Sequence, residues 1–297
     1  MKTLIIGGCG YVGSCLMTSL PDVKSVDLEI FERNSDNTVI DFDDLHEEYL
    51  DLFDNIILLA GYSSFKMCYG NEYGVFNNNV VNFVNLLNKL THQIFIYASS
   101  ASVYGDTQKE FVDENTSFAR PYNAYDASKQ MIDGYAVTAS DRKGRTFGLR
   151  FGTVNGYAPH LRTDVMLNAM VTTAWRTNEV VVYNGHTNRS ILGTNDLYRA
   201  IYTIIHSDNP GGIYNLASFS ETATEMGQYV AERMGVEFKT IEAEQSASQY
   251  DFKLSCDKFK KDFDFSFHQD VTDIVTSLLD NKDNMKFSHR NLSYEYK

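Results

Sequence analysis

The sequence predicts an α/β protein in which a doubly wound parallel sheet is joined to a smaller C-terminal lobe. Three observations support this fold: short apolar strands alternate with helical patterns in the first half, a glycine cluster follows the first strand, and the rhythm changes past Thr153. Strands that are apolar throughout belong to parallel sheets with helices on both faces. We therefore expect a sheet domain over residues 1–153 and a lobe mainly over 154–297, interleaved with the last strands of the sheet.

Each expected element follows from its local pattern. Apolar runs bounded by turn residues predict strands over residues 2–7, 23–29, 37–42, 55–61, 93–100 and 145–152. Amphipathic spacing predicts helices over residues 11–20, where Pro21 ends the helix, 77–90 and 124–140. In the lobe we expect a helix over 165–176 and strands over 179–185 and 212–218, whereas the segment from about residue 280 has no assignable pattern.

Composition and charge restrict the possible functions. The chain has 297 residues, 43% of them hydrophobic, and a formal net charge of −13 from 26 basic and 39 acidic residues. This acidic balance disfavours nucleic-acid and anionic-membrane partners, because both need a basic face. An anionic small ligand stays compatible if arginines and backbone amides surround it locally.

Cysteine usage points to a reducing compartment. Cys9, Cys15, Cys68 and Cys256 show neither paired metal-ligand spacing nor disulfide density. The opening apolar run is too short for a signal peptide, and no run approaches the roughly 20 apolar residues of a membrane span. We therefore expect a cytoplasmic protein that holds no metal.

The glycine cluster lies between the first strand and the first helix. Gly8, Gly10 and Gly13 fit the pattern G-x-G-x-x-G, and Gly7, Gly10 and Gly13 fit G-x-x-G-x-x-G. Such glycines form either an ordinary tight turn or a Rossmann-type cradle, in which the backbone and the helix N-terminus approach a pyrophosphate. Asp27 ends the second strand, 19 residues after Gly8, where an acid can bind the ribose hydroxyls and repel a 2′-phosphate. Taken alone, Asp27 would be a solvated strand-end residue, but beside the glycines it favours NAD over NADP.

Residues suited to acid–base chemistry follow the fifth strand. Tyr125 and Lys129 are spaced i, i+4 and so share one face of a helix. We expect the lysine ammonium and the positive nicotinamide ring to lower the pKa of the tyrosine, which would then act as a base. Ser100 and Ser102 lie at the carboxyl end of the strand, where a hydroxyl either holds a substrate oxygen or satisfies strand-end backbone groups.

Seven motifs over roughly residues 3 to 220 resemble one family. They are "GGCGYVG", "LAG", "NNNV", "SSASVYG", "YDASK", "LRFGTVNG" and "NRSILGTND". In this order they resemble the extended short-chain dehydrogenases/reductases, in the NAD-dependent nucleotide-sugar epimerase/dehydratase group (UDP-glucose 4-epimerase-like). The resemblance implies NAD as cofactor and a nucleotide-diphosphate sugar as substrate.

The resemblance also assigns roles to residues of this chain. It implies that Ser100, Tyr125 and Lys129 are catalytic. It implies a cofactor site lined by Gly7, Gly10, Tyr11, Val12, Asp27, Asp41, Phe42, Leu59, Ala60, Gly61, Asn79, Ala98, Tyr125 and Lys129. On the substrate side it implies Ser100, Thr153, Arg162 and Arg189, with Arg189 on the diphosphate; a surface ion pair is the alternative for both arginines.

Departures from the family pattern narrow the reaction. The 4,6-dehydratases carry an Asp-Glu pair where this chain has Ala101 and Ser102, so dehydration is disfavoured. Thr153 and Asn155 stand where many epimerases have asparagine and tyrosine, which leaves the sugar open.

We expect epimerisation at C4 through a 4-keto intermediate. A C4 dehydrogenase or ketoreductase would use the same residues, and a non-catalytic NAD-binding regulator is a third possibility. The resemblance further implies a homodimer formed through the helices over 80–90 and 125–139.

Overall fold

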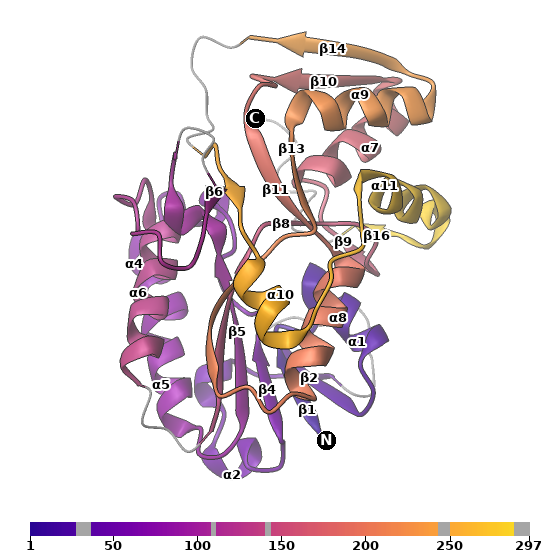
Figure 1. Cartoon of the computed structure of the whole chain (residues 1–297). Coiled ribbons are helices and arrows are strands. Elements are labelled where there is room, and N and C mark those ends of the chain that lie inside the picture. Colours follow the sequence, from indigo (N-terminus) through magenta and orange to yellow (C-terminus); the bar gives the residue numbers. More distant parts are fainter. Residues whose placement is uncertain (28–36, 108–110, 140–143, 243–249, 288–297) are drawn as a thin grey trace.

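The computed structural model describes residues 1–27, 37–107, 111–139, 144–242 and 250–287 (Figure 1). Its centre is a seven-stranded sheet in the order β12-β7-β5-β4-β1-β2-β3, in which all neighbouring strands are parallel. The strands are β1 (Thr3–Ile6), β2 (Val23–Asp27), β3 (Asn37–Val39), β4 (Asn55–Leu58), β5 (Ile94–Ser100), β7 (Thr146–Phe151) and β12 (Gly211–Leu216). The chain moves outward from β1 in both directions, so the predicted doubly wound fold is confirmed.

Helices cover both faces of this sheet (Figure 1). One face carries α2 (Glu47–Leu50), α4 (Glu72–Phe76), η2 (Asn77–Val81), α5 (Asn82–Lys89) and α6 (Ala124–Thr138). The other face carries α1 (Tyr11–Ser19), α8 (Thr194–Ile205) and α10 (Asp257–Phe263). Shorter pieces lie at or near the carboxyl ends of the strands: η1 (Phe42–Asp44), α3 (Phe65–Cys68) and η3 (Ala101–Tyr104).

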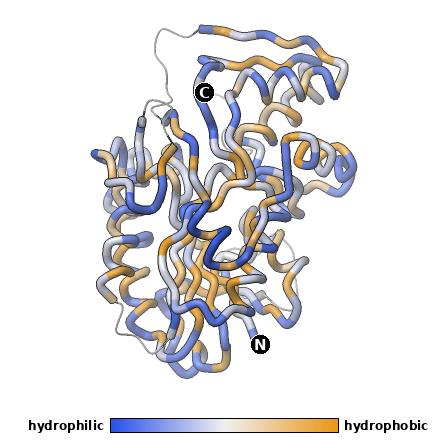
Figure 2. The backbone as a smooth tube through the Cα atoms, in the orientation of Figure 1, coloured by the Kyte–Doolittle hydropathy of each residue, from blue (hydrophilic) through white to orange (hydrophobic). Residues whose placement is uncertain are grey.

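The strands form where the sequence is apolar on both faces. Every residue of β1 and β4 is buried, and hydrophobic segments run through the middle of the molecule in Figure 2. Helix α1 ends at Ser19 with Leu20 as its C-cap, immediately before Pro21, as predicted. The helix predicted over 77–90 forms, but its first part, η2, is a π-helix.

The lobe contains helices α7 (Met166–Thr177), α9 (Ala223–Met234) and α11 (Val271–Asp280), followed by η4 (Lys282–Asn284). In its sheets, β11 (Asn188–Gly193) lies between β8 (Thr153–Asn155) and β13 (Phe219–Thr222), β10 (Glu179–Tyr183) pairs with β14 (Glu237–Ile241), and β9 (His160–Leu161) pairs with β16 (Lys286–Phe287). A further pair joins β6 (Phe111–Val112) to β15 (Lys253–Leu254). The expected lobe helix and the strand expected over 179–185 are present in the lobe as α7 and β10, whereas the strand expected over 212–218 forms as β12 in the main sheet.

Segments of the second half return to the main sheet. Strand β12 pairs with β7, and residues of α8 and α10 share a hydrophobic core with β1, β4 and β7. Residues after 153 therefore complete the sheet domain. The division at residue 153 into a cofactor-binding part and a mainly substrate-binding part stays a prediction. The ends of the strand expected over 23–29 and of the helix expected over 124–140, and most of the unassigned segment after residue 280, lie outside the described residues.

Candidate active site

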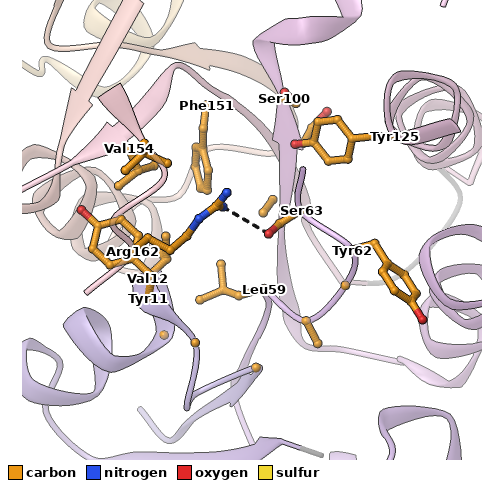
Figure 3. A pocket seen from close by; sticks show the side chains of 18 of the residues that line it. Tyr11, Val12, Leu59, Tyr62, Ser63, Ser100, Tyr125, Phe151, Val154 and Arg162 are labelled. Carbon is orange, nitrogen blue, oxygen red and sulfur yellow. Dashed lines mark hydrogen bonds between the residues drawn. The ribbon is translucent and has the colours of Figure 1, made fainter. Parts of the chain in front are cut away.

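A cavity of about 710 Å³ lies at the carboxyl ends of β1, β2, β4 and β5, between the sheet and the lobe (Figure 3). All the predicted site residues except Asp41 and Asn79 line it. Carboxyl ends of parallel strands are where open α/β sheets bind ligands, because the strand order reverses there and leaves a crevice.

The glycine-rich turn forms the floor next to α1. Gly7 has φ +94°, and a Cβ placed on it would lie 2.5 Å from the backbone nitrogen of Ala60. A Cβ on Gly13 would lie 2.1 Å from the carbonyl oxygen of Gly7, so α1 approaches the turn closely only because this residue is glycine. Gly10 is different: its Cβ would meet nothing closer than 3.4 Å, and Gly10 lines the cavity as the N-cap of α1. Gly7, Gly10 and Gly13, rather than Gly8, therefore face the cavity.

Asp27 closes the far side of this turn. It is the last residue of β2, and its Oδ2 accepts a hydrogen bond of 3.0 Å from the backbone N–H of Cys9. The carbonyl of Cys9 in turn accepts a hydrogen bond of 2.8 Å from Nδ1 of His160, a lobe residue that also lines the cavity. The backbone of Cys9 in the turn is thus hydrogen-bonded to both Asp27 and His160.

Asp41 and Asn79 support the cavity from outside. The carboxylate of Asp41 caps η1 by accepting the N–H of Asp43 at 3.1 Å, while its neighbour Phe42 lines the cavity. Asn79 is buried and accepts the N–H of Tyr62 at 2.9 Å. It thereby holds the loop after β4, in which Leu59, Ala60 and Gly61 reach the cavity.

The predicted catalytic cluster comes together at the end of β5. Ser100 is the last residue of β5, and its Oγ accepts the N–H of Ser102 at 3.1 Å. Tyr125 and Lys129 share one face of α6, whose N-terminus is capped by the side chain of Asn123. Ser100, Tyr125 and Lys129 all line the cavity, and Figure 3 shows Ser100 close to Tyr125.

Lys129 lies against the ring of Tyr125. The Nζ of Lys129 donates to the carbonyl of Ala98 at 2.6 Å and lies 5.8 Å from the centre of the Tyr125 ring. Burial raises the pKa of Tyr125, and the groups that oppose this rise are the hydroxyl of Ser100 and the positive charge of Arg162. Burial also lowers the pKa of Lys129 to about 8, against the attraction of Asp133.

Arg162 crosses the cavity from the lobe (Figure 3). Its Nε and Nη2 form a bidentate ion pair with Asp164 at 2.7 and 2.9 Å, and its Nη1 donates to the Ser63 hydroxyl at 3.3 Å. For Arg162 the sequence left two alternatives, a substrate-binding residue and a surface ion pair. The arginine forms an ion pair and also lines the cavity.

Arg189 and Thr153 lie on neighbouring strands of the lobe. Arg189 on β11 donates through Nη1 to its neighbour Asn188's carbonyl at 3.0 Å and to the carbonyl of Tyr250. Thr153 opens β8, which pairs in parallel with β11 through Thr153 and Ile191. Both residues line the cavity.

Sequence reasoning missed several lining residues. His160, Ser63, Tyr250 and Phe252 line the cavity although no motif indicated them. Tyr250 and Phe252 alternate with polar residues just before β15. This alternation weakly predicts a strand, but it does not predict which strand lies beside it.

No group of three or more potential metal ligands occurs within the described ranges. Among the helices of those ranges, none has the length and apolar character of a membrane span.

The doubly wound sheet, the glycine-rich first turn and a Tyr–Lys pair facing one cavity define an enzyme of the extended short-chain dehydrogenase/reductase type. A family model described as the NAD dependent epimerase/dehydratase family matches residues 3–217. The chain belongs to this family, and NAD is the cofactor that the family uses.

Individual relatives are more distant. Protein CapI of Staphylococcus aureus is 28% identical, over 69% of this chain and 69% of that protein. MoeE5, solved with UDP-glucuronic acid and NAD, superimposes with a TM-score of 0.83 at 19% identity, over 95% of this chain and 99% of that one. A UDP-N-acetylglucosamine 4-epimerase from Methanobrevibacter ruminantium, solved with UDP-N-acetylmuramic acid, gives 0.81 at 18% identity, over 94% and 98%. At these identities the structural likeness shows the fold alone.

The turn itself fits a dinucleotide. Gly10 lines the cavity at the start of α1, whose first turn has no side-chain cap and no acidic residue. The first N–H groups of a helix lack intrahelical partners and carry positive partial charge, which suits a pyrophosphate.

Proposed function

We propose that this protein epimerises a nucleotide-diphosphate sugar at C4 through a 4-keto intermediate. The observation that carries the proposal is that Ser100, Tyr125 and Lys129 line the same cavity as the glycine-rich turn and Arg189. The nucleotide sugars in the two structures named above support this substrate class. Ala101 and Ser102 follow Ser100, and neither is a general acid or base, which disfavours a 4,6-dehydratase.

NAD, when bound, supplies the oxidant that takes a hydride from C4 and the reductant that returns it. The residues proposed to hold it lie mainly in 1–153: Gly7, Gly10, Tyr11, Val12, Asp27, Phe42, Leu59, Ala60, Gly61, Ala98, Tyr125 and Lys129. Asp41 and Asn79 would support the site through Phe42 and Tyr62 rather than by contact.

The chain's own residues handle the proton and the substrate. Tyr125 takes the proton of the C4 hydroxyl, Ser100 positions the C4 oxygen, and Lys129 orients Tyr125 and the nicotinamide ribose. Arg189 anchors the diphosphate while the keto sugar turns over, since a guanidinium pairs with two phosphate oxygens. Thr153 and Arg162 complete the substrate wall; Arg162 belongs to the lobe of residues 154–297, and Thr153 immediately precedes that lobe.

Incubation with UDP-, GDP-, CDP- and dTDP-sugars tests this function. Thermal stabilisation identifies the nucleotide, because a ligand that binds the native state raises the melting temperature. A sugar isomer formed without net change in NADH supports epimerisation, whereas a net change indicates a C4 dehydrogenase or ketoreductase. NAD binding without turnover of any sugar would favour a non-catalytic regulator, and the absence of NAD affinity would refute the proposal.

We also infer a homodimer. Tyr73 and Phe76 on α4 and Met131 and Val137 on α6 are exposed apolar side chains on helices that pack together. Exposed apolar patches of this kind mark interaction surfaces. Light scattering after size-exclusion chromatography should give twice the chain mass, and Met131→Glu should reduce it. Cys9, Cys15, Cys68 and Cys256 are buried and form no disulfide, which supports the proposed cytoplasmic location.

A further inference from the structure

Tyr250 is tied at the tip of its ring to the helix that carries Tyr125. Its hydroxyl donates to Oδ2 of Asp126 at 2.7 Å and accepts a hydrogen bond from the side-chain amide of Asn123 at 3.0 Å. Asn123 is the N-cap of α6, and Asp126 lies in the first turn of that helix, where it is 1% exposed. A hydrogen bond to a carboxylate shielded from water is stronger than one at the surface. The side chain of Tyr250 is therefore fixed to the start of α6.

The backbone of the same residue holds the proposed diphosphate anchor. The carbonyl of Tyr250 accepts a hydrogen bond from Nη1 of Arg189, which also donates to the carbonyl of Asn188 at 3.0 Å. The next residue, Asp251, accepts the backbone N–H and the side-chain amide of Asn188 through its Oδ1 at 2.8 and 2.9 Å. Residues 250 and 251 thus contact β11 at Asn188 and Arg189, while the ring of Tyr250 reaches α6.

This arrangement connects two groups of the proposed mechanism that lie on different elements. Tyr125 on α6 and Arg189 on β11 both line the cavity, and Tyr250 is hydrogen-bonded to both elements. An arginine side chain has many rotamers, so holding it in place before the ligand arrives reduces the entropy that is lost on binding. The bonds of Tyr250 therefore preorganise Arg189 with respect to Tyr125.

We propose that Tyr250 is a positioning residue, which holds Arg189 at a set distance from Tyr125 and thereby keeps the sugar nucleotide bound while its keto form turns over. This inference rests on the proposed function. The hydroxyl of Tyr250 attaches the residue to α6, and its carbonyl transmits this position to Arg189. Tyr250 itself takes part in no proton or hydride transfer.

A purely structural role is the alternative. In that case the hydroxyl would only stabilise the start of α6, and the bonds of Asp251 would be enough to place Arg189. Tyr97 provides a matched control, since its hydroxyl donates to Oδ1 of Asp133 on the same helix at 3.1 Å and neither residue lines the cavity. Tyr97→Phe and Tyr250→Phe should lower the melting temperature by similar amounts, whereas only Tyr250→Phe should weaken ligand binding.

Calorimetric titration of the NAD-saturated protein with inorganic pyrophosphate tests the link without assuming a base or a sugar. Arg189→Lys and Tyr250→Phe should each weaken pyrophosphate binding by about three- to tenfold, as expected for the loss of one hydrogen bond. The double variant should bind no more weakly than Arg189→Lys alone, because the two residues act as one unit. Wild-type affinity in Tyr250→Phe, with Arg189→Lys weakened, would overturn the inference and leave the proposed function standing. Equal affinity in the wild type and Arg189→Lys would refute the diphosphate role of Arg189, and this inference with it.

Turnover of UDP-glucose or UDP-glucuronic acid gives the second readout. Tyr250→Phe should raise KM for the sugar nucleotide by about three- to tenfold. It should also cause NADH to accumulate, because a keto sugar that escapes cannot take its hydride back, and Tyr97→Phe should show neither change. A wild-type KM together with NAD that stays oxidised in Tyr250→Phe would contradict the inference. If the wild type turns over neither sugar, weakened pyrophosphate binding in Tyr250→Phe supports the link and places the failure in the proposed function.

Discussion

The two sides of the cavity are built in different ways. The glycine-turn side consists of the turn from Gly7 to Gly13, Asp27 and the loop after β4, which are short segments directly following strands. The lobe side consists of Thr153, Arg162, Arg189 and Tyr250, which come from separate segments of the second half. The first side works largely through backbone geometry and the second through long side chains. Substitutions on the glycine-turn side should therefore weaken NAD binding and lower stability. Substitutions on the lobe side should weaken substrate binding alone.

The largest effect is expected at Gly7. Gly7→Ala places a Cβ 2.5 Å from the backbone of Ala60 at a φ of +94°, which an L side chain rarely adopts. We expect loss of measurable NAD binding and a lower melting temperature. Gly134→Ala on α6 is the matched control: its Cβ would meet nothing within 4 Å, and it should stabilise the helix by up to about 1 kcal/mol. Normal NAD affinity in Gly7→Ala would remove the main support for the glycine-turn side.

Tyr125→Phe should separate chemistry from cofactor binding. Loss of the proposed base should lower kcat by about 10² to 10⁴-fold, whereas the ring and its packing remain. Titration with NAD should give an affinity close to that of the wild type. Turnover at the wild-type rate would show that another group is the base.

Arg189→Lys tests the lobe side. A lysine cannot reproduce the fork of a guanidinium on a diphosphate or its bonds to two carbonyls, so KM for the sugar nucleotide should rise about tenfold. NAD affinity should stay unchanged, because Arg189 lies on β11 of the lobe and not on the glycine-rich turn. An equal loss of affinity for both ligands would mean that the two sides are not independent.

Asp27→Asn tests whether the glycine-turn side selects NAD over NADP. The amide can still accept the N–H of Cys9, which keeps the turn in place, but the negative charge is gone. Affinity for NADP should increase by about tenfold, with little change for NAD. Comparison of the two dissociation constants measures this, and unchanged discrimination would remove Asp27 from the cofactor site.

The smallest effect concerns stability and pH at Lys129. Burial lowers its pKa to about 8, below the usual 10.5, so between these values the unfolded chain holds a proton that the native state lacks. Native stability therefore rises with pH across this window, and the cost of burying the ammonium is fully present below pH 8. Lys129→Met should raise the melting temperature by a few degrees at pH 7, by an amount that shrinks as pH approaches 10. A constant difference across this range would contradict the lowered pKa.

Most of the fold and the glycine-turn side were predictable because their signals are local. The apolar runs of β1, β4 and β5, the glycines of the first turn and Pro21 each act on their own neighbourhood in the chain. Parallel pairing then brings the strand ends to one edge, so Asp27 and Ala60 could be placed near the turn without coordinates. The i, i+4 spacing of Tyr125 and Lys129 was likewise sufficient to predict that they share one face of α6.

Other features depend on contacts between residues far apart in sequence. The bidentate pair of Arg162 with Asp164, the tie from His160 to Cys9 and the bond from Tyr250 to Asp126 follow from how the lobe packs onto the sheet. The raised pKa of Tyr125 also belongs here, because burial and distant charges set it. Backbone preferences and side-chain periodicity are encoded within a few residues, whereas desolvation and charge pairing exist only once the chain has closed around them.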